Sequence, residues 1–300
     1  MSDVQFAVGR QRGAVKIFSA HKFLLSVRSD VFRAMFYGEL PENTAQPIDI
    51  PEILPAAFAC MLSFVYTGTV EAVEGLPPPS SLVCAESVTE VLYCADKYHL
   101  PQLTKMALNA VLSRLDHASC LDYLENAQRW PLESCARVVQ ECLYWVDVCS
   151  DVVLGTERFC ALAPETLQLI LQRNTLCVDE NAVYTAAEKW AAAACLRNAL
   201  DASPGNRRAM LGPALFLIRF PLLTDAQLTD GPVQSGLLLD SEVVALYRYK
   251  HAAVRPLLPF AAGPRAVCAP STRTPPDAPE GATNGAASGR GFQARLAARK

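Results

Sequence analysis

The sequence has few of the residues from which metal sites and catalytic centres are commonly built. It contains four histidines in 300 residues, and none of them forms an HExxH or similar metal-binding pattern. It also lacks a GxGxxG fingerprint, a Walker phosphate-binding loop, a GxSxG nucleophile elbow and a paired acidic motif of the glycosidase type. We therefore expect no enzymatic activity, no bound cofactor and no resident metal.

The chain is also short of long apolar runs, secretion signals and excess charge. No run approaches the ~20 apolar residues that a membrane helix requires, no charged-then-apolar leader opens the chain, and no Asn-x-Ser/Thr glycosylation site occurs. A net charge of −3 and a pI near 5.9 provide no global field that would attract nucleic acid or an acidic membrane. These absences predict a cytoplasmic protein, with the nucleus as the alternative, and neither a nucleic-acid nor a membrane partner.

Eleven cysteines are present, but their distribution does not suit a disulfide framework. They spread from Cys60 to Cys268, their number is odd, and most lie within apolar helical patterns. We interpret them as reduced thiols in the protein core.

Two cysteine patterns resemble parts of metal sites but lack the spacing of a complete one. Cys135, Cys142 and Cys149 recur every seven residues, and two helical turns separate neighbours too widely for one zinc ion to collect all three. His117 and Cys120 could begin a site, but no matching second pair follows at zinc-finger spacing. Both patterns favour core or near-core positions.

The first 115 residues combine short strands with helices. Residues 4–9 and 15–18 alternate apolar and polar side chains around a polar turn and predict a hairpin, and residues 48–50 predict a third strand. Ser29 is a plausible N-cap for a short helix that Gly38 ends, and Pro55 suits the first turn of the next helix. Ser87 and Glu90 have the spacing of a capping box for a third helix, before another over residues 101–115. This mixture predicts a compact α+β unit.

The rest of the chain to about residue 249 has almost no strand signal. Apolar stripes at helical spacing predict a helical bundle, and they consist of Leu132, Ala136, Val139, Leu143 and Val146 and of Val183, Ala186, Ala187, Trp190 and Ala194. Residues 263–300 hold five prolines, five glycines, six basic and two acidic residues, a composition typical of a disordered tail. Deleting this tail is therefore expected to change thermal stability very little.

One loop stands out as a candidate for protein recognition. Leu40, Pro41 and Glu42 follow the short helix and place an apolar side chain two positions before a carboxylate. The proline between them fixes φ and limits the entropy of the loop, which favours presentation of a hydrophobic anchor beside a charge. An ordinary polar connection is the alternative interpretation.

Four blocks in the first 115 residues resemble a BTB/POZ domain. They read DVQFAVG, FSAHKFLLSVRSDVFRAMFYGEL, IDIPEILPAAFACMLSFVYTGTVE and VLYCADKYHLPQL. The helical part, with LDYLENAQRW, AAEKWAAAAC and NRRAMLGPALFLIRFPLLT, resembles the BACK domain of proteins that join BTB, BACK and a C-terminal PHR β-sandwich. The resemblance covers about five-sixths of the chain and implies an α+β BTB/POZ domain over residues 1–115, an all-α BACK bundle over residues 116–250 and the tail over residues 263–300.

The resemblance also assigns roles to individual residues. It makes His21 the structural histidine of a BTB signature, whose members here are Asp3, His21, Phe32, Met35, Phe36 and Tyr66. Leu40-Pro41-Glu42 matches the φ-x-E element by which cullin-binding BTB domains contact cullin-3. Leu40 would then fill an apolar pocket and Glu42 would supply a hydrogen-bonded or ionic contact, while helices between residues 119 and 148 would extend the interface.

The family function that this resemblance implies is that of an adaptor in ubiquitin conjugation. Such proteins form homo-oligomers through the BTB domain and recruit a protein substrate, unknown here, to a cullin-3 RING ubiquitin ligase. The sequence departs from the family pattern because it begins at the first strand without the N-terminal dimerisation helix, carries an extended segment at residues 75–87, and shows no PHR pattern after residue 250.

These departures lead us to expect a weakened homodimer or a heterodimer with another BTB protein, built on the apolar helices around Phe23, Leu24, Val31 and Phe32. The departures also keep a second function open, a scaffold or inhibitory short form that binds cullin or BTB partners without presenting substrate. Transcriptional repression through BTB oligomers ranks third, because no C2H2 spacing is present to reach DNA.

Overall fold

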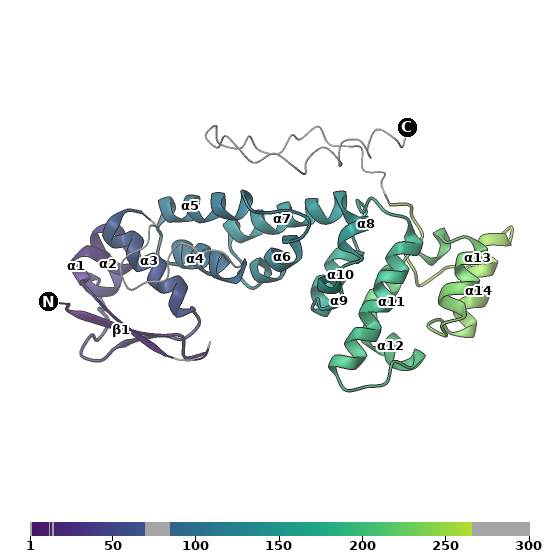
Figure 1. Ribbon diagram of the computed structural model, residues 1–300, viewed down its shortest axis with the longest axis horizontal. Helices are drawn as coiled ribbons and strands as arrows, with labels where there is room; N and C mark the ends of the chain where they lie inside the picture. The colour runs from purple at the N-terminus through teal and green to yellow at the C-terminus, as the bar shows by residue number, and fades with distance from the viewer. Residues whose placement is uncertain (1, 12, 14, 70–84, 266–300) are drawn as a thin grey trace, which may run out of the picture. The chain divides into compact units, whose positions relative to one another are not determined.

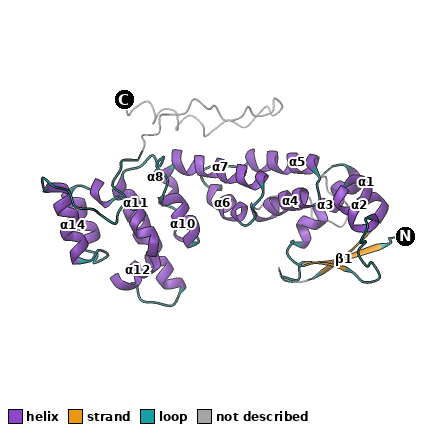
Figure 2. Cartoon of the chain, turned by 180° about the vertical axis from the view of Figure 1, so that it is seen from behind, coloured by secondary structure: helices purple, strands orange, loops and turns teal. Residues whose placement is uncertain are grey.

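The computed structural model of the protein describes residues 2–11, 13, 15–69 and 85–265, except for the side chains of residues 85–87 (Figure 1). Most of the predicted insertion at residues 75–87 and nearly all of the predicted tail lie outside the described residues. The described chain begins with a small sheet and then consists of helices (Figure 2). The predicted class, an α+β unit followed by an all-α bundle, is confirmed.

A three-stranded sheet is formed by the segments predicted as strands. β1 (Val4–Val8) lies in the centre, between β2 (Lys16–Ala20) and β3 (Ile48–Ile50). β1 pairs antiparallel with β2, with Phe6 opposite Phe18, and parallel with β3, with Phe6 opposite Ile48. The parallel pairing brings residue 48 beside residue 6, so the chain between β2 and β3 crosses the sheet as helices.

Local capping explains where these first helices begin and end. Ser29 has extended backbone angles between α1 (Lys22–Arg28) and α2 (Asp30–Tyr37), and its Oγ accepts a hydrogen bond from the Phe32 N–H at 3.2 Å. α3 (Pro55–Thr67) starts with proline at its first position, where the missing N–H costs nothing. Gly68 ends it in the left-handed region at φ 77°. These predicted caps are confirmed.

An aromatic cluster forms the core beneath the sheet. Phe6, Phe32, Phe58 and Tyr98 are all buried. Phe32 stacks on Tyr98 with ring centroids 4.4 Å apart, and Phe6 lies 5.2 Å from Phe58. Offset and edge-on aromatic packing of this kind adds about 0.5–1.5 kcal/mol per pair beyond area burial. The cluster holds β1, α2 and α3 against α4 (Ala85–Lys97).

The capping box predicted for α4 is wrong. The helix begins at Ala85, two residues before Ser87, so Ser87 lies inside its first turn. Glu90 is buried, and its Oε2 accepts a hydrogen bond from the Leu54 N–H at 2.7 Å. The Glu90 carboxylate therefore bonds to the N-cap residue of α3, 36 residues earlier in the chain. Spacing along the sequence does not reveal such a long-range contact.

Helices on both sides of residue 115 pack against each other. α4 and α5 (Pro101–Leu112) contact α7 (Glu133–Val148), and α4 also contacts α6 (Cys120–Gln128). Tyr93 stacks on Trp130 with centroids 3.8 Å apart, and the Ser134 hydroxyl donates to Asp96. The helical bundle therefore continues directly from the last two helices of the α+β unit.

The remaining helices complete the bundle around one long, buried element. They are α8 (Ser150–Val153), α9 (Glu157–Cys160), α10 (Pro164–Leu171), α11 (Glu180–Arg197), α12 (Pro204–Leu211), α13 (Asp225–Leu228) and α14 (Asp240–His251). The apolar stripe predicted on α11 is buried, and the Trp190 indole donates to the Leu162 carbonyl at 2.9 Å. In the described part of the chain, no helix has the length and apolar character needed to cross a membrane.

Nine cysteines lie among the described residues, and no disulfide bond joins any of them. Six are buried, Cys60 and Cys160 are half-buried, and Cys177 is exposed. Burial raises the pKa of Cys60 to about 11 and that of Cys120 to about 12, because a thiolate loses hydration inside the protein. The neutral thiol is therefore the stable form of these groups at neutral pH.

We expect thiol-specific alkylation at pH 8 to separate these cysteines. The thiolate is the reactive form, and a pKa of about 11 leaves roughly one thiolate in a thousand at that pH. Cys177 should react within minutes in the native protein, whereas Cys94, Cys120 and Cys142 should react only as the fold opens. Residue-resolved mass spectrometry during a time course is the measurement, and rapid labelling of Cys120 in folded protein would contradict the core assignment.

Candidate protein-interaction site

The loop after α2 presents one fully projecting apolar side chain. Leu40 is 93% exposed, and Glu42 is exposed two residues later. The loop is nevertheless fixed to the helix before it, because the Glu42 N–H donates to the carbonyl of Met35 at 2.9 Å. A rigid loop that exposes leucine carries less entropy to lose on binding than a free one.

Gly38 permits the sharp exit from α2. A Cβ atom at this position would lie 2.3 Å from the Ala34 carbonyl oxygen, a backbone atom that cannot move aside. The Gly38 N–H donates to the same carbonyl at 2.9 Å. The chain can therefore turn tightly here only with glycine, and this turn sets the direction in which Leu40 projects.

The far end of the loop is tied to α1. The Lys22 ammonium donates to the Thr44 hydroxyl at 2.7 Å, and the Ala45 N–H donates to the Asn43 side-chain oxygen at 3.0 Å. The Leu40-Pro41-Glu42 segment is thus bracketed by the backbone bonds of Gly38 and Glu42 to α2, and Thr44 ties the chain that follows it to α1.

His21 lies at the N-cap position of α1, and its contacts are structural. Its Nδ1 is 2.8 Å from the Tyr66 hydroxyl, which also accepts the His21 backbone N–H at 3.0 Å. Asp3 accepts the Lys22 N–H at 2.8 Å and so satisfies a free donor in the first turn of the helix. Partial burial raises the pKa of Tyr66, so its hydroxyl stays protonated and can donate.

The other signature residues of α2 belong to the core of the α+β unit. Phe32 and Phe36 are buried and stack on each other with centroids 5.9 Å apart, while Met35 is half-buried against the core. These side chains anchor α2 in the core, and the loop that follows the helix leaves Leu40 and Glu42 to face solvent.

A second exposed apolar surface lies on α1. Phe23 is 68% and Val27 is 66% exposed, and Leu24 is partly exposed beside them. The sequence-based choice of residues for this surface is partly wrong: Val31 is half-buried and Phe32 belongs to the core. Val27 was missed, although its position four residues after Phe23 on one helix is the signal that could have found it. We refer to Phe23, Leu24 and Val27 as the α1 face.

The residues considered for a metal site do not come together in the part of the chain that the structure describes. Within it, no group of three or more His, Cys, Asp or Glu side chains has a geometry suitable for a metal ion. His117 is exposed, and the buried Cys120 thiol donates to its backbone carbonyl at 3.4 Å.

Comparison with known proteins agrees with the fold. The BTB/POZ domain family matches residues 1–115, and the family described as BTB And C-terminal Kelch, BACK, matches residues 120–231. A BTB/POZ domain followed by a BACK domain defines a class of protein-interaction proteins.

The chain belongs to the BTB–BACK family. It is 34% identical over 260 residues to BTB/POZ domain-containing protein 6 of Mus musculus, covering 87% of this chain and 45% of that protein. It has the same identity over the same length to protein 6-B of Danio rerio and protein 3 of Homo sapiens, covering 51% and 47% of those proteins. The chain thus spans about half the length of the curated relatives it matches.

Proposed function

We propose that the protein is an adaptor that recruits a protein substrate to a cullin-3 RING ubiquitin ligase. The observation that carries the proposal is the projecting Leu40, followed by Glu42 on a loop fixed to α2 within a BTB domain. Such an adaptor forms and breaks no bonds itself. It holds the substrate near the ubiquitin-charged enzyme and so raises effective concentration and orients the reacting groups.

The chemistry of the loop supports this contact. An isolated leucine side chain on a rigid loop can fill an apolar pocket on a helical partner, and burial of such a side chain contributes about 1.5–3 kcal/mol. Glu42 adds a charge beside the anchor and favours a partner surface with a hydrogen-bond donor or cation there. α6 and α7 supply the helical pair expected to extend the interface.

We further propose that the α1 face mediates self-association or pairing with another BTB protein. Phe23 and Val27 form an exposed apolar surface next to Leu24. Exposure of such a surface to water is unfavourable, and it is the feature expected of an interface. Its limited size favours a weak dimer that dissociates on dilution.

We also propose a cytoplasmic location, which can be checked by imaging a tagged chain.

We expect Phe23→Asp together with Val27→Asp to abolish self-association. Two carboxylates in the centre of an apolar interface would have to lose their hydration without a partner. Sedimentation velocity of the 300-residue chain over a hundredfold dilution series should show a monomer–dimer equilibrium for the native sequence and a monomer for the variant. Unchanged dimerisation of the folded variant would place the interface on a different surface.

Affinity purification of the tagged chain, with and without proteasome inhibition, tests the adaptor proposal. Recovery of cullin-3 together with proteins that accumulate under inhibition supports substrate recruitment. Cullin-3 alone supports the second function, an inhibitory or scaffolding form that binds cullin without presenting substrate. Absence of cullin-3 from both samples would contradict the adaptor function and leave only the form of the second function that binds BTB partners.

A further inference from the structure

The chain folds back onto the bundle after α14 ends. Residues 252–257 are exposed apart from the half-buried Pro256, and residues 258–265, which we call the strap, then contact earlier helices. Phe260 is buried, with ring centroids 5.7 Å from Phe216 and 4.9 Å from Phe220. The Ala261 N–H donates to the Phe216 carbonyl at 3.1 Å. The strap thus has an aromatic anchor and a backbone contact.

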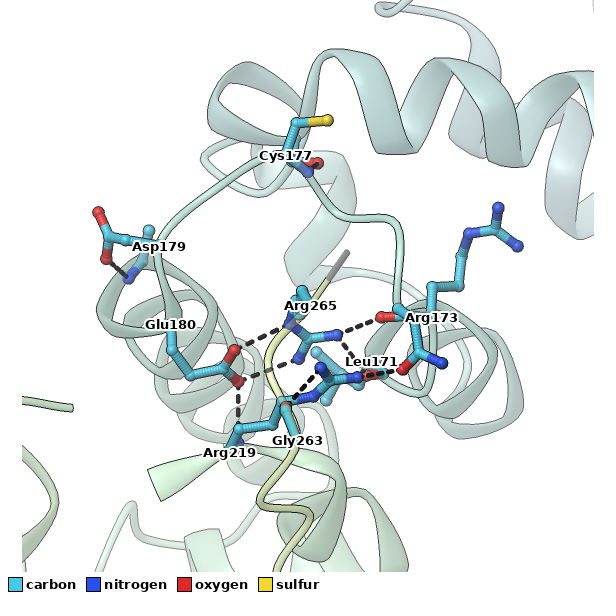
Figure 3. Close-up of polar contacts among 11 residues, drawn as sticks. Leu171, Arg173, Cys177, Asp179, Glu180, Arg219, Gly263 and Arg265 are labelled. Carbon is cyan, nitrogen blue, oxygen red and sulfur yellow. Dashed lines mark hydrogen bonds and ion pairs between the residues drawn. The ribbon is translucent and has the colours of Figure 1, made fainter. Parts of the chain in front are cut away.

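Arg265 ends the strap in a buried site that matches all sides of its guanidinium group (Figure 3). Its side chain is 6% exposed and pairs with the Glu180 carboxylate, itself 4% exposed, through contacts of 2.8 and 3.0 Å. Its Nη1 donates to the Leu171 carbonyl at 3.0 Å and also to the Arg173 carbonyl. These carbonyls lie at the C-terminal end of α10, where the helix dipole favours a cation.

Arg219 joins the strap to the same carboxylate. Its backbone N–H donates to Glu180 at 2.9 Å, and its guanidinium group donates to the Gly263 carbonyl at 2.8 Å and to Asn174 (Figure 3). Its Nε is buried with no hydrogen-bond partner among the described residues. Burial first, and Arg265 second, lower the pKa of Arg219. Two guanidinium groups therefore lie close to one carboxylate, and closing the strap costs some electrostatic repulsion.

The contacts of the strap are those of a bound peptide. A short segment that is neither helix nor strand supplies one buried ring and, five residues later, one arginine whose fork-shaped donors meet a carboxylate and two carbonyls. We define the strap site by the groups that receive it, namely Phe216, Arg219, Phe220, the Glu180 carboxylate and the carbonyls of Leu171 and Arg173. A lysine could not reproduce the forked contacts, so the site selects arginine.

We propose that the strap is a latch, an intramolecular ligand that occludes a peptide-binding site on the helical domain. The ligands of this site are short peptide segments with an aromatic side chain followed five residues later by an arginine. The exposed residues 252–257 act as its tether. Because a short tether gives an effective concentration in the millimolar range, a free segment competes only when its own affinity is high or the latch is weakened. This site is separate from the Leu40 loop and does not depend on cullin binding.

A labelled, amidated peptide of residues 257–265 (LLPFAAGPR) provides the probe. The full chain with Phe260→Ala and Arg265→Ala should bind this peptide at least tenfold more tightly than the native chain, whose own strap occupies the site. A peptide with alanine in place of its arginine should bind the weakened chain at least tenfold less tightly. The matched receptor control is the chain with Arg255→Ala. This substitution removes an arginine of the tether, which lies over the ring of Tyr249 in α14. The control chain should bind the peptide as weakly as the native chain does.

Circular dichroism establishes that the weakened chain is folded, and hydrogen exchange of the native chain tests the latch without any substitution. The Ala261 amide should exchange at least tenfold faster than the central amides of α11, because the strap opens while the bundle stays folded. Failure of the folded, weakened chain to bind the peptide would overturn the proposal, as would equal binding of the alanine peptide. Exchange of Ala261 only at the rate of global unfolding would also overturn it.

Discussion

Ending the chain at Ala262 lowers the apparent melting temperature of the helical domain by about 6–12 °C, whereas ending it at Arg265 leaves that temperature almost unchanged. The first truncation removes Arg265 from the nearly fully buried Glu180 and removes the Gly263 carbonyl from Arg219. The second keeps every contact that the structure shows for the strap.

The size of the effect follows from the burial of the pair. Breaking a buried ion pair by removing one partner costs about 3–5 kcal/mol, because the remaining charge is left without compensation. We expect about 3 kcal/mol here, since loss of residues 263–265 lets water reach Glu180.

This expected loss of stability differs from the expectation drawn from composition. Residues 263–300 were predicted to be a tail whose deletion leaves stability unchanged, but Gly263 and Arg265 are bound to the bundle. The pair of truncations separates the two views by calorimetry or by circular dichroism melts. Equal melting temperatures for the two truncated chains would show that the buried pair contributes nothing.

If the proposed contact is right, Leu40→Ala together with Glu42→Ala should weaken binding to cullin-3 at least ~10-fold while the fold stays intact. Leu40 projects fully into solvent, so its loss removes no intramolecular packing. Central anchors of an interface commonly carry about 2 kcal/mol or more each, and the double substitution removes both the apolar anchor and the charge beside it. Glu42 keeps its backbone bond to Met35 in the variant, so the loop should retain its path.

Glu39→Ala is the matched control for this variant. It removes an equal charge from the same loop, one residue before Leu40, but lies outside the Leu-Pro-Glu element. Its cost should be less than about threefold, because a charge at the rim of an interface acts mainly on the association rate. If the double variant binds as tightly as the native chain in calorimetry, the contact lies on another surface.

Most of the local structure was predictable from the sequence because neighbouring residues determine it. Ser29 caps α2, Pro55 starts α3 and Gly68 ends it. Each of these features depends on one side chain and the backbone within a few residues of it.

The choice of which face of a helix is buried is less secure. On α7 the predicted apolar stripe included Ala136, which is exposed, whereas the neighbouring Cys135 is buried. Cysteine packs as a small apolar residue, and the prediction gave it too little weight.

The long-range contacts could not be predicted from the sequence. Glu90 resembles part of a capping box but hydrogen-bonds to Leu54, and Arg265 lies in a proline- and glycine-rich segment but pairs with Glu180, 85 residues earlier. Such contacts depend on how helices pack, and no periodicity encodes them. The loop at Leu40 was recognisable because its composition is local, whereas the anchoring of that loop by Lys22 and Met35 required the structure.

Titration of the purified 300-residue chain with the N-terminal region of cullin-3 in a calorimeter tests the central claim most directly. The account predicts saturable binding with one cullin per BTB domain, reduced at least ~10-fold by Leu40→Ala with Glu42→Ala and retained after Arg265→Ala. The absence of binding by the folded native chain at about 100 μM would contradict the assignment of this protein as a cullin-3 adaptor.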